Sequence, residues 1–148
     1  MITVRQATVD DVALVAPLFN EYRVYYKQAS DLESAKIFLQ DRLLRNESIV
    51  FLALNDGEAA IGFTQLYPIF SSVSLKKAWL LNDLFVHESA RGNGAGKELL
   101  KAAKELGEET DSKFLMLQTQ LDNEGAQKLY SSNGWKPLSD MFFQLDLY

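Results

Sequence analysis

The sequence predicts an α/β (α+β) fold in which a mixed, mostly antiparallel sheet is flanked by about four helices. The first observation is the order of hydrophobic spacings along the chain, which alternate between strand and helix periods as βααβββαβαβ. The second is the length of 148 residues with 47% hydrophobic composition. These values suit a single domain, residues 1–148, with a substantial buried core.

The first part of the chain is predicted to form one strand followed by two helices. A short strand at residues 2–8 leads into a helix of about 17 residues that starts near position 9, with Thr8 or Asp10 as its N-cap. Ser30-x-x-Glu33 has the spacing of a capping box, and apolar residues follow it on one helical face. A second helix is therefore expected to end near Asn46.

Two strand-like runs at residues 48–54 and 60–67 are predicted to form a hairpin. They flank Asp56-Gly57, a pair typical of tight turns that need positive φ angles. Pro68 lacks a backbone N–H and is expected to end the second strand.

The rest of the chain is predicted to contain three more strands and two more helices. Gly134 has the position of a residue that closes a helix at its C-terminus. The predicted strands are residues 75–86, 114–119 and 141–147, and the predicted helices follow a glycine-rich segment at 90–97 and occupy 124–133.

The composition excludes several classes of chemistry. There is no cysteine and only one histidine, so thiol nucleophiles, disulfides and the usual transition-metal sites are not expected. A net charge of −5 argues against a nucleic-acid partner. The longest apolar run, Ile49–Leu54, is much shorter than a membrane span, and no secretory signal is evident. A cytoplasmic protein without a membrane partner is expected.

The glycine-rich segment is the strongest chemical feature. Glycines at 92, 94 and 96 lie between a predicted strand and a predicted helix, where backbone N–H groups and the helix dipole favour a phosphate. An ATP-type P-loop is excluded because Glu98 follows Lys97 where Ser or Thr is needed. The dinucleotide fingerprint fails because it requires glycine at position 97.

Two separated motifs resemble those of the GNAT N-acetyltransferases. Arg91-x-x-Gly94-x-Gly96 resembles the pyrophosphate-binding motif of that family, and residues 81–86 look like its fourth strand. Residues 123–135 are similar to its Asn-x-x-Ala-x-x-Leu-Tyr-x-x-x-Gly-aromatic signature. The resemblance covers nearly the whole chain and implies an acetyl-CoA-dependent enzyme, with a homodimer as the expected assembly.

The resemblance also implies where acetyl-CoA binds. Amides of the glycine-rich segment would hold the pyrophosphate, one strand edge would pair with the pantetheine, and the second motif would line the other side. The implied cofactor-binding residues are Leu84, Phe85, Val86, Arg91, Gly92, Asn93, Gly94, Ala95, Gly96, Lys97, Asn123, Ala126 and Tyr130.

Direct acetyl transfer requires proton movement at both ends of the reaction. An amine is mostly protonated at pH 7, so a base must free its lone pair, and the departing thiolate needs an acid. Tyr130, at the family position, is the predicted acid. Related polyamine acetyltransferases have glutamate where Asn82 stands here, so the base is either Asp83, which needs a bulge to re-aim its side chain, or a water held by Asn82.

The acceptor is expected to be a primary amine of a small molecule. Tyr22, Tyr25, Gln65 and Tyr67 fall in regions that border the acceptor cleft in this fold, and aromatic faces suit a cation. Tyr22 also lies on an apolar stripe that favours packing. Two alternatives stay open, namely an acetyltransferase that modifies protein lysines or N-termini, and a non-catalytic acyl-CoA sensor.

Overall fold

The computed structural model describes residues 1–148, which fall into two compact units, Met1–Gln118 and Thr119–Tyr148. The first unit contains the whole sheet and three of the four α-helices, and the second contains α4 (Glu124–Ser132). No helix combines the length and the apolar character that crossing a membrane would require.

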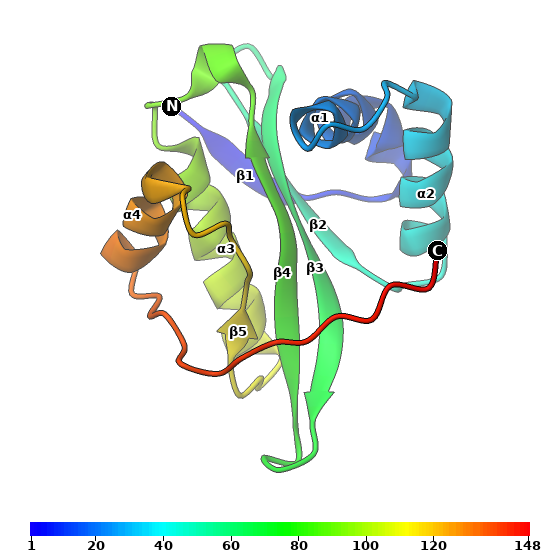
Figure 1. Ribbon diagram of the computed structural model, residues 1–148. Helices are drawn as coiled ribbons and strands as arrows, with labels where there is room; N and C mark the ends of the chain where they lie inside the picture. The colour runs from blue at the N-terminus through cyan, green and yellow to red at the C-terminus, as the bar shows by residue number, and fades with distance from the viewer. The chain divides into compact units, whose positions relative to one another are not determined.

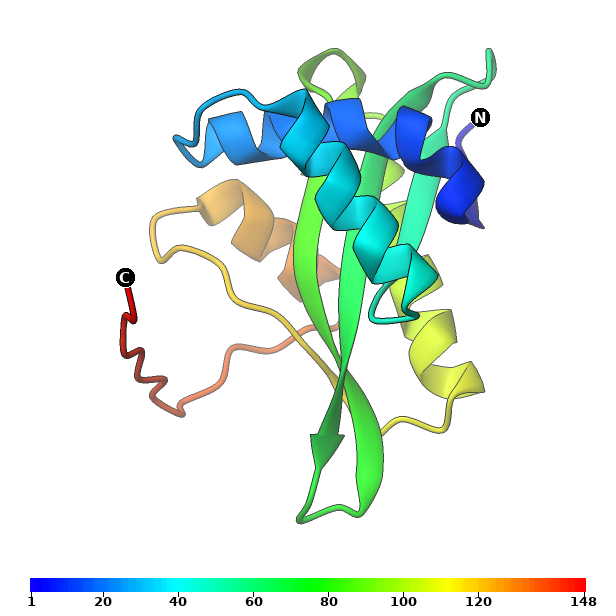
Figure 2. The same cartoon turned by 90° about the vertical axis from the view of Figure 1, so that its right-hand side faces the viewer.

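The sheet has five strands in the order β1-β2-β3-β4-β5. The first four strands pair antiparallel, and β5 pairs parallel to β4, which confirms the predicted mixed, mostly antiparallel sheet. The β3–β4 hairpin extends beyond the other strands (Figure 2). The strand bounds are β1 Thr3–Gln6, β2 Ile49–Leu54, β3 Ala60–Ser71, β4 Lys76–Val86 and β5 Leu115–Met116.

Helices cover both faces of this sheet. α1 (Val12–Tyr25) and α2 (Leu32–Leu44) lie on one face, and α3 (Ala95–Glu109) lies on the other (Figure 1). The core accordingly has two parts. Phe63 and Leu39 belong to the cluster on the α1–α2 side, whereas Ile61 and Leu99 belong to the cluster on the α3 side.

The first helical segment begins as predicted, but the second has a different cap. Thr8 caps a short 3₁₀ turn, η1 (Val9–Asp11), that leads into α1, and the Asp11 carboxylate accepts a hydrogen bond from the Thr8 N–H. The capping box predicted at Ser30 is wrong. Asp31 caps α2 instead, and the Ser30 hydroxyl accepts a hydrogen bond from Asn20.

The β2–β3 turn confirms the hairpin but not the residue with positive φ. Glu58 has a φ of 59°, whereas Gly57 is not in the left-handed region. The Asn55 side chain accepts bonds from the N–H groups of Gly57 and Ala59, at 2.9 and 3.0 Å. The Asn55 side chain thus holds a turn whose left-handed position is taken by Glu58 and not by glycine.

Pro68 does not end β3, which continues to Ser71. Pro68 lies opposite Trp79 of β4. The Trp79 N–H points away from β3 and donates to the Phe114 carbonyl, so Pro68 and Trp79 exchange no hydrogen bonds. The missing N–H of Pro68 faces the β2 edge, where pairing stops at Leu66. Proline is tolerated because no ladder bond is required there.

The end of the chain departs most from the prediction. The strand expected at residues 141–147 does not form, and the one expected at 114–119 is limited to Leu115–Met116. Alternating apolar residues describe a face, but a strand also needs a hydrogen-bonded neighbour, which the pattern cannot supply. Gly134, with a φ of 89°, closes α4 as predicted.

Candidate active site

A bulge in β4 decides which way its polar residues point. Gln65 pairs with Asp83 but Leu66 pairs with Leu81, so Asn82 is an extra residue in β4. Trp79, two residues before Leu81, faces α3, where its indole donates to Thr110 at the helix end. Strict alternation would place residue 83 on that same face.

The bulge instead turns Asp83 toward α1 and α2. Phe85, on the same face as Asp83 after the bulge, belongs to the core cluster of the α1–α2 side, while Leu84 and Val86 pack on the α3 side. Bulges re-aim side chains in this way and are frequent beside active sites. Asn82 is left exposed next to the carboxylate.

Asp83 is a buried carboxylate surrounded by donors. Only 4% of the residue is exposed. Gln65 Nε2 donates to Asp83 Oδ2 at 2.8 Å, and Asn82 Nδ2 donates to Oδ1 at 3.1 Å. The Tyr22 side chain also hydrogen-bonds to this carboxylate. Thr64 Oγ1 donates to the Asp83 carbonyl at 2.8 Å, which ties the bulge to β3.

Burial raises the pKa of Asp83, and the bonds from Gln65, Tyr22 and Asn82 only partly oppose that effect. The neighbouring phenols respond to the same environment. Burial and the Asp83 charge raise the pKa of Tyr67 to about 12, and burial raises that of Tyr26. A carboxylate with a raised pKa between neutral phenols is suited to receive a proton.

The edge of β4 beyond the bulge is open. β5 pairs with β4 only at Trp79 and Leu80, so residues 81–86 have no strand beside them on this edge. The His87 N–H donates to Ile61 on β3, and alternation therefore directs the N–H groups of Leu84 and Val86 to the open edge. This edge can bind an extended amide chain.

The glycine-rich segment leads from η2 (Glu88–Ala90) into α3 and presents backbone donors. Gly92 and Gly94 have φ angles of 85° and 88°, and Gly94 is the N-cap of α3 without any side-chain cap. A Cβ on either glycine would meet nothing within 4 Å. Glycine is therefore required by the positive φ angle and not by a lack of space. None of the N–H groups of residues 92–97 donates to a protein acceptor.

Arg91 differs from the other residues of this segment. Its own N–H donates to Glu88 at 3.3 Å, and its side-chain Nε donates to the Val86 carbonyl at 2.9 Å. Its guanidinium lies 5.7 Å from the centre of the Phe85 ring. Arg91 therefore connects the segment to β4, and the available amides are those of residues 92–97.

The second motif lies in the second unit. Asn123 caps α4, and its Oδ1 accepts the Ala126 N–H at 3.1 Å, which gives the asparagine of the motif a structural role. The Tyr130 ring lies 6.2 Å from that of Trp135, and the Tyr130 carbonyl accepts the Trp135 N–H. The roles of Asn123, Ala126 and Tyr130 toward acetyl-CoA stay predictions.

The predicted acceptor residues separate into two groups. Tyr22 packs edge-on against Phe63 and Phe85, with ring centres 5.9 and 6.1 Å away, while Tyr25 is 59% exposed. Tyr67 is half-buried, and Gln65 is fully buried. Gln65 therefore contacts Asp83 and not solvent, whereas Tyr25 is open to an incoming molecule.

The sequence did not predict two residues of this site. Thr64 and Ser48 are both buried, and each forms a hydrogen bond within the Asp83 surroundings. The polar pair Thr64-Gln65 interrupts an apolar run in β3, and this interruption was the available signal. Nothing in the sequence distinguishes Ser48 from the other serines.

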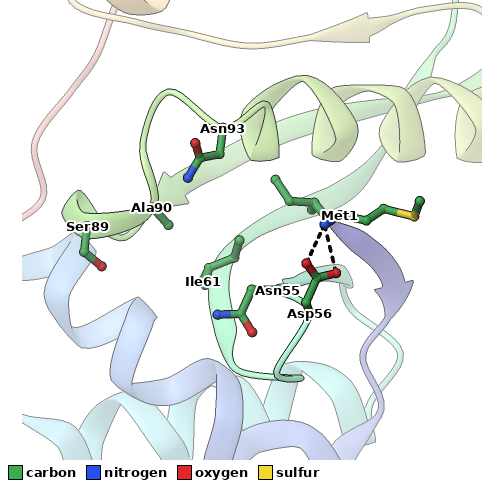
Figure 3. A pocket seen from close by; sticks show the side chains of 8 residues that line it. Met1, Asn55, Asp56, Ile61, Ser89, Ala90 and Asn93 are labelled. Carbon is green, nitrogen blue, oxygen red and sulfur yellow. Dashed lines mark hydrogen bonds and ion pairs between the residues drawn. The ribbon is translucent and has the colours of Figure 1, made fainter.

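A separate hollow of about 440 Å³ lies beside the glycine-rich segment. Polar and apolar residues both line it, and the Met1 ammonium in it pairs with Asp56 at 2.8 Å (Figure 3). It contains none of the candidate acid or base residues, and no three His, Asp or Glu side chains in the structure are grouped to hold a metal ion. Its lining residues are Met1, Ile2, Asn55, Asp56, Ile61, Ser89, Ala90 and Asn93.

The chain is similar to known acetyltransferases. The model of the acetyltransferase (GNAT) family matches residues 15–135. An uncharacterized N-acetyltransferase of Bacillus subtilis (strain 168), YhfO, is 52% identical over 133 residues, which are 90% of this chain and 89% of that protein. A probable acetyltransferase of Haemophilus influenzae is 36% identical over 129 residues, 85% and 84% of the two chains.

The fold is shared with a solved structure as well. The crystal structure of a probable acetyltransferase superimposes with a TM-score of 0.93 at 42% identity, covering 99% of this chain and 98% of the other.

Proposed function

This chain belongs to the GNAT family of acetyltransferases, and we propose that it moves the acetyl group of acetyl-CoA to a primary amine of a small molecule. The observation that supports this most is the buried Asp83 carboxylate, which the β4 bulge turns away from the α3 face. The amine attacks the thioester directly within a ternary complex, so the protein needs no nucleophile of its own.

The residues of the first unit fit acetyl-CoA. The N–H groups of residues 92–97 gather at the N-terminus of α3, where a pyrophosphate is stabilised. On the open β4 edge, the Leu84 N–H would pair with a pantetheine carbonyl, and the Val86 N–H would stabilise the oxyanion that forms during attack. Acetyl-CoA supplies the sulfur and the activated acetyl group.

Asp83 receives the proton that the ammonium of the acceptor must lose. The carboxylate is almost fully buried, so a water at the exposed Asn82 side chain would connect it to the amine. The freed amine forms the new C–N bond as the C–S bond breaks. Tyr130 donates its phenolic proton to the departing sulfur, which leaves as the thiol of coenzyme A.

A small cationic acceptor suits the surroundings of Asp83. Tyr22, Tyr26 and Tyr67 approach the carboxylate from α1 and β3, and Tyr25 is exposed at the end of α1. Aromatic faces with one buried negative charge attract an alkylammonium group. An acceptor that places its amine among these rings is favoured over a folded protein surface.

The proposal extends to the whole chain. The family model spans parts of both units, which supports one functional domain over residues 1–148. A cytoplasmic location is part of the proposal. A homodimer is added by family resemblance, and light scattering after size-exclusion chromatography tests it.

A thiol-release assay with acetyl-CoA tests the function and separates the alternatives. The panel contains diamines, amino acids, amino sugars, lysine peptides and free N-terminal peptides, and calorimetry measures acetyl-CoA binding in parallel. Release with small amines supports the proposal. Release only with peptides identifies a protein acetyltransferase, and binding without any release identifies a sensor.

A further inference from the structure

We infer that Gln65 is a positioning residue which, fixed by Ser48, holds the Asp83 carboxylate in place as the acceptor of the amine proton. This inference rests on the proposed function, because it assigns Asp83 the role of base. Gln65 and Ser48 are buried, so they do not contact an amine substrate that enters from solvent.

The three side chains form a continuous chain of hydrogen bonds from the residue before β2 through β3 to β4. Ser48, just before β2, donates from Oγ to Gln65 Oε1 at 2.8 Å. Gln65 of β3 donates from Nε2 to Asp83 Oδ2 of β4, also at 2.8 Å. The exposed fractions are 4% for Ser48, 0% for Gln65 and 4% for Asp83, so water does not compete for these bonds.

This chain sets the orientation of the Gln65 amide while Asp83 is ionised. A carboxylate only accepts hydrogen bonds, so the amide must present its NH₂ group to Asp83 when Asp83 is ionised. Ser48 satisfies the opposite end of the amide by donating to its oxygen. Without Ser48, the buried amide oxygen would lack this donor.

The same chain can also accommodate the protonated state of Asp83. A hydroxyl donates or accepts, and an amide turned by half a rotation presents its oxygen to a protonated carboxyl and its NH₂ group to Ser48. Each polar atom then keeps a partner in both protonation states. A buried base must be stable in both states during each turnover, and Ser48 with Gln65 meets that requirement.

Other groups also influence the Asp83 carboxyl, and a test must allow for them. Tyr22 of α1 hydrogen-bonds to it, and Tyr26, just after α1, and Tyr67 of β3 lie close enough for its charge to raise their pKa values. Arg42 of α2 acts on Tyr67 in the opposite sense. Because the pKa values of Tyr26 and Tyr67 are raised above the ordinary 10.0, these two phenols stay neutral in a titration of the carboxyl between pH 4 and 9.

The test measures the Asp83 pKa and the reaction separately. Carbon-13 NMR of labelled aspartate follows the Asp83 carboxyl in the ligand-free protein for wild type, Gln65→Leu, Gln65→Glu and Ser48→Ala. Thiol release gives the pH profile of kcat/KM for the same proteins. Gln40→Leu, an exposed position on α2, is the matched control.

Gln65→Leu removes a donor to the ionised carboxylate, so we expect the pKa of Asp83 and the acidic limb of kcat/KM to rise together by about one pH unit. Gln65→Glu places a second carboxyl there, which would share a proton with Asp83 and raise the apparent pKa further. Ser48→Ala should shift both readouts in the same direction by less. Gln40→Leu should match wild type.

If the Asp83 pKa is unchanged in both folded Gln65 variants, the inference is overturned. It is also overturned if these variants lose kcat/KM equally at every pH while the acidic limb of the profile does not move. Circular dichroism establishes which variants fold, and two different substitutions at position 65 keep the test decisive. If wild type releases no thiol with any amine, the proposed function fails. A raised Asp83 pKa in Gln65→Leu would still support the positioning contact in that case.

Discussion

The Gln65 amide and the Asp83 carboxylate face each other across β3 and β4, with Nε2 and Oδ2 separated by 2.8 Å. Both side chains are buried, and Asn82 occupies the bulge directly beside the pair. The sheet thus encloses a charged group that a purely structural core would avoid. This relationship is the basis of the catalytic proposal, and it also predicts a cost in stability.

Asp83→Asn is expected to raise the thermal midpoint of unfolding at pH 8. Burial raises the pKa of Asp83 above its ordinary value of 3.8, so the folded protein holds the proton more tightly than the unfolded chain does. Wild-type stability therefore falls as the pH rises from 3.8 through the folded pKa, and the variant escapes this loss. Thermal unfolding at pH 4 and pH 8 checks this. If the thermal midpoint of Asp83→Asn, relative to wild type, is lower at pH 8 than at pH 4, this prediction is contradicted.

Asp11 is expected to show the opposite dependence on pH. The Arg5 side chain and then the Thr8 N–H lower the pKa of Asp11 to about 2, from an ordinary 3.8. Its contribution to stability is present above pH 3.8 and is lost as the pH falls toward 2. Asp11→Asn should reduce the free energy of unfolding by about 1–2 kcal/mol at pH 7, and this difference should nearly vanish at pH 2.

Urea unfolding of wild type and Asp11→Asn across this pH range provides the measurement. Asp56→Asn, which alters an exposed ion pair with Met1, is the control and should change stability by less than about 1 kcal/mol. Equal losses in the two variants at pH 7 would show that the partly buried Arg5–Asp11 pair stabilises the fold no more than the exposed Met1–Asp56 pair does.

Gly94→Ala is expected to weaken acetyl-CoA binding about tenfold or more. Gly94 caps α3 with a φ of 88°, where a Cβ costs about 1–2 kcal/mol in backbone strain although nothing lies within 4 Å of it. Relief of that strain would shift the N–H groups that are proposed to hold the pyrophosphate. Calorimetry with acetyl-CoA measures the effect, and Gly57→Ala, outside the left-handed region, is the control. Unchanged binding in both variants contradicts this role of the segment.

Tyr130→Phe is expected to lower kcat about 100-fold while leaving the Kd for acetyl-CoA within about threefold of wild type. The phenol is the proposed donor to the departing sulfur, and phenylalanine keeps the ring without the proton. Tyr148→Phe, at an exposed position, is the matched control. Full turnover of Tyr130→Phe across the alkaline pH range would remove Tyr130 from the mechanism.

Local patterns were enough to predict several features of the backbone around the helices and the candidate site. Thr8 as a helix cap, Gly134 as a helix end and the glycines at 92 and 94 each depend on nearby backbone, and the structure places all of them as expected. The need for a bulge near Asp83 also followed from the alternation of strand side chains.

Features that depend on partners far along the chain could not be predicted. Pro68 continues a strand only because its missing N–H faces an edge without a neighbour. Residues 141–147 have a strand pattern but no hydrogen-bonded strand beside them. Ser48 joins the site through a bond to Gln65, 17 positions away, which no local pattern reveals.

The most direct test of the account is acetyl transfer by wild type and Asp83→Asn, measured as thiol release with a small amine from pH 5 to 9, with acetyl-CoA affinity measured on the same samples. Wild type should show a kcat/KM that rises with pH to a plateau. Asp83→Asn should bind acetyl-CoA as wild type does and lose about 100-fold or more of that plateau. An Asp83→Asn protein with the wild-type rate and pH profile would contradict the assignment of Asp83 as the base.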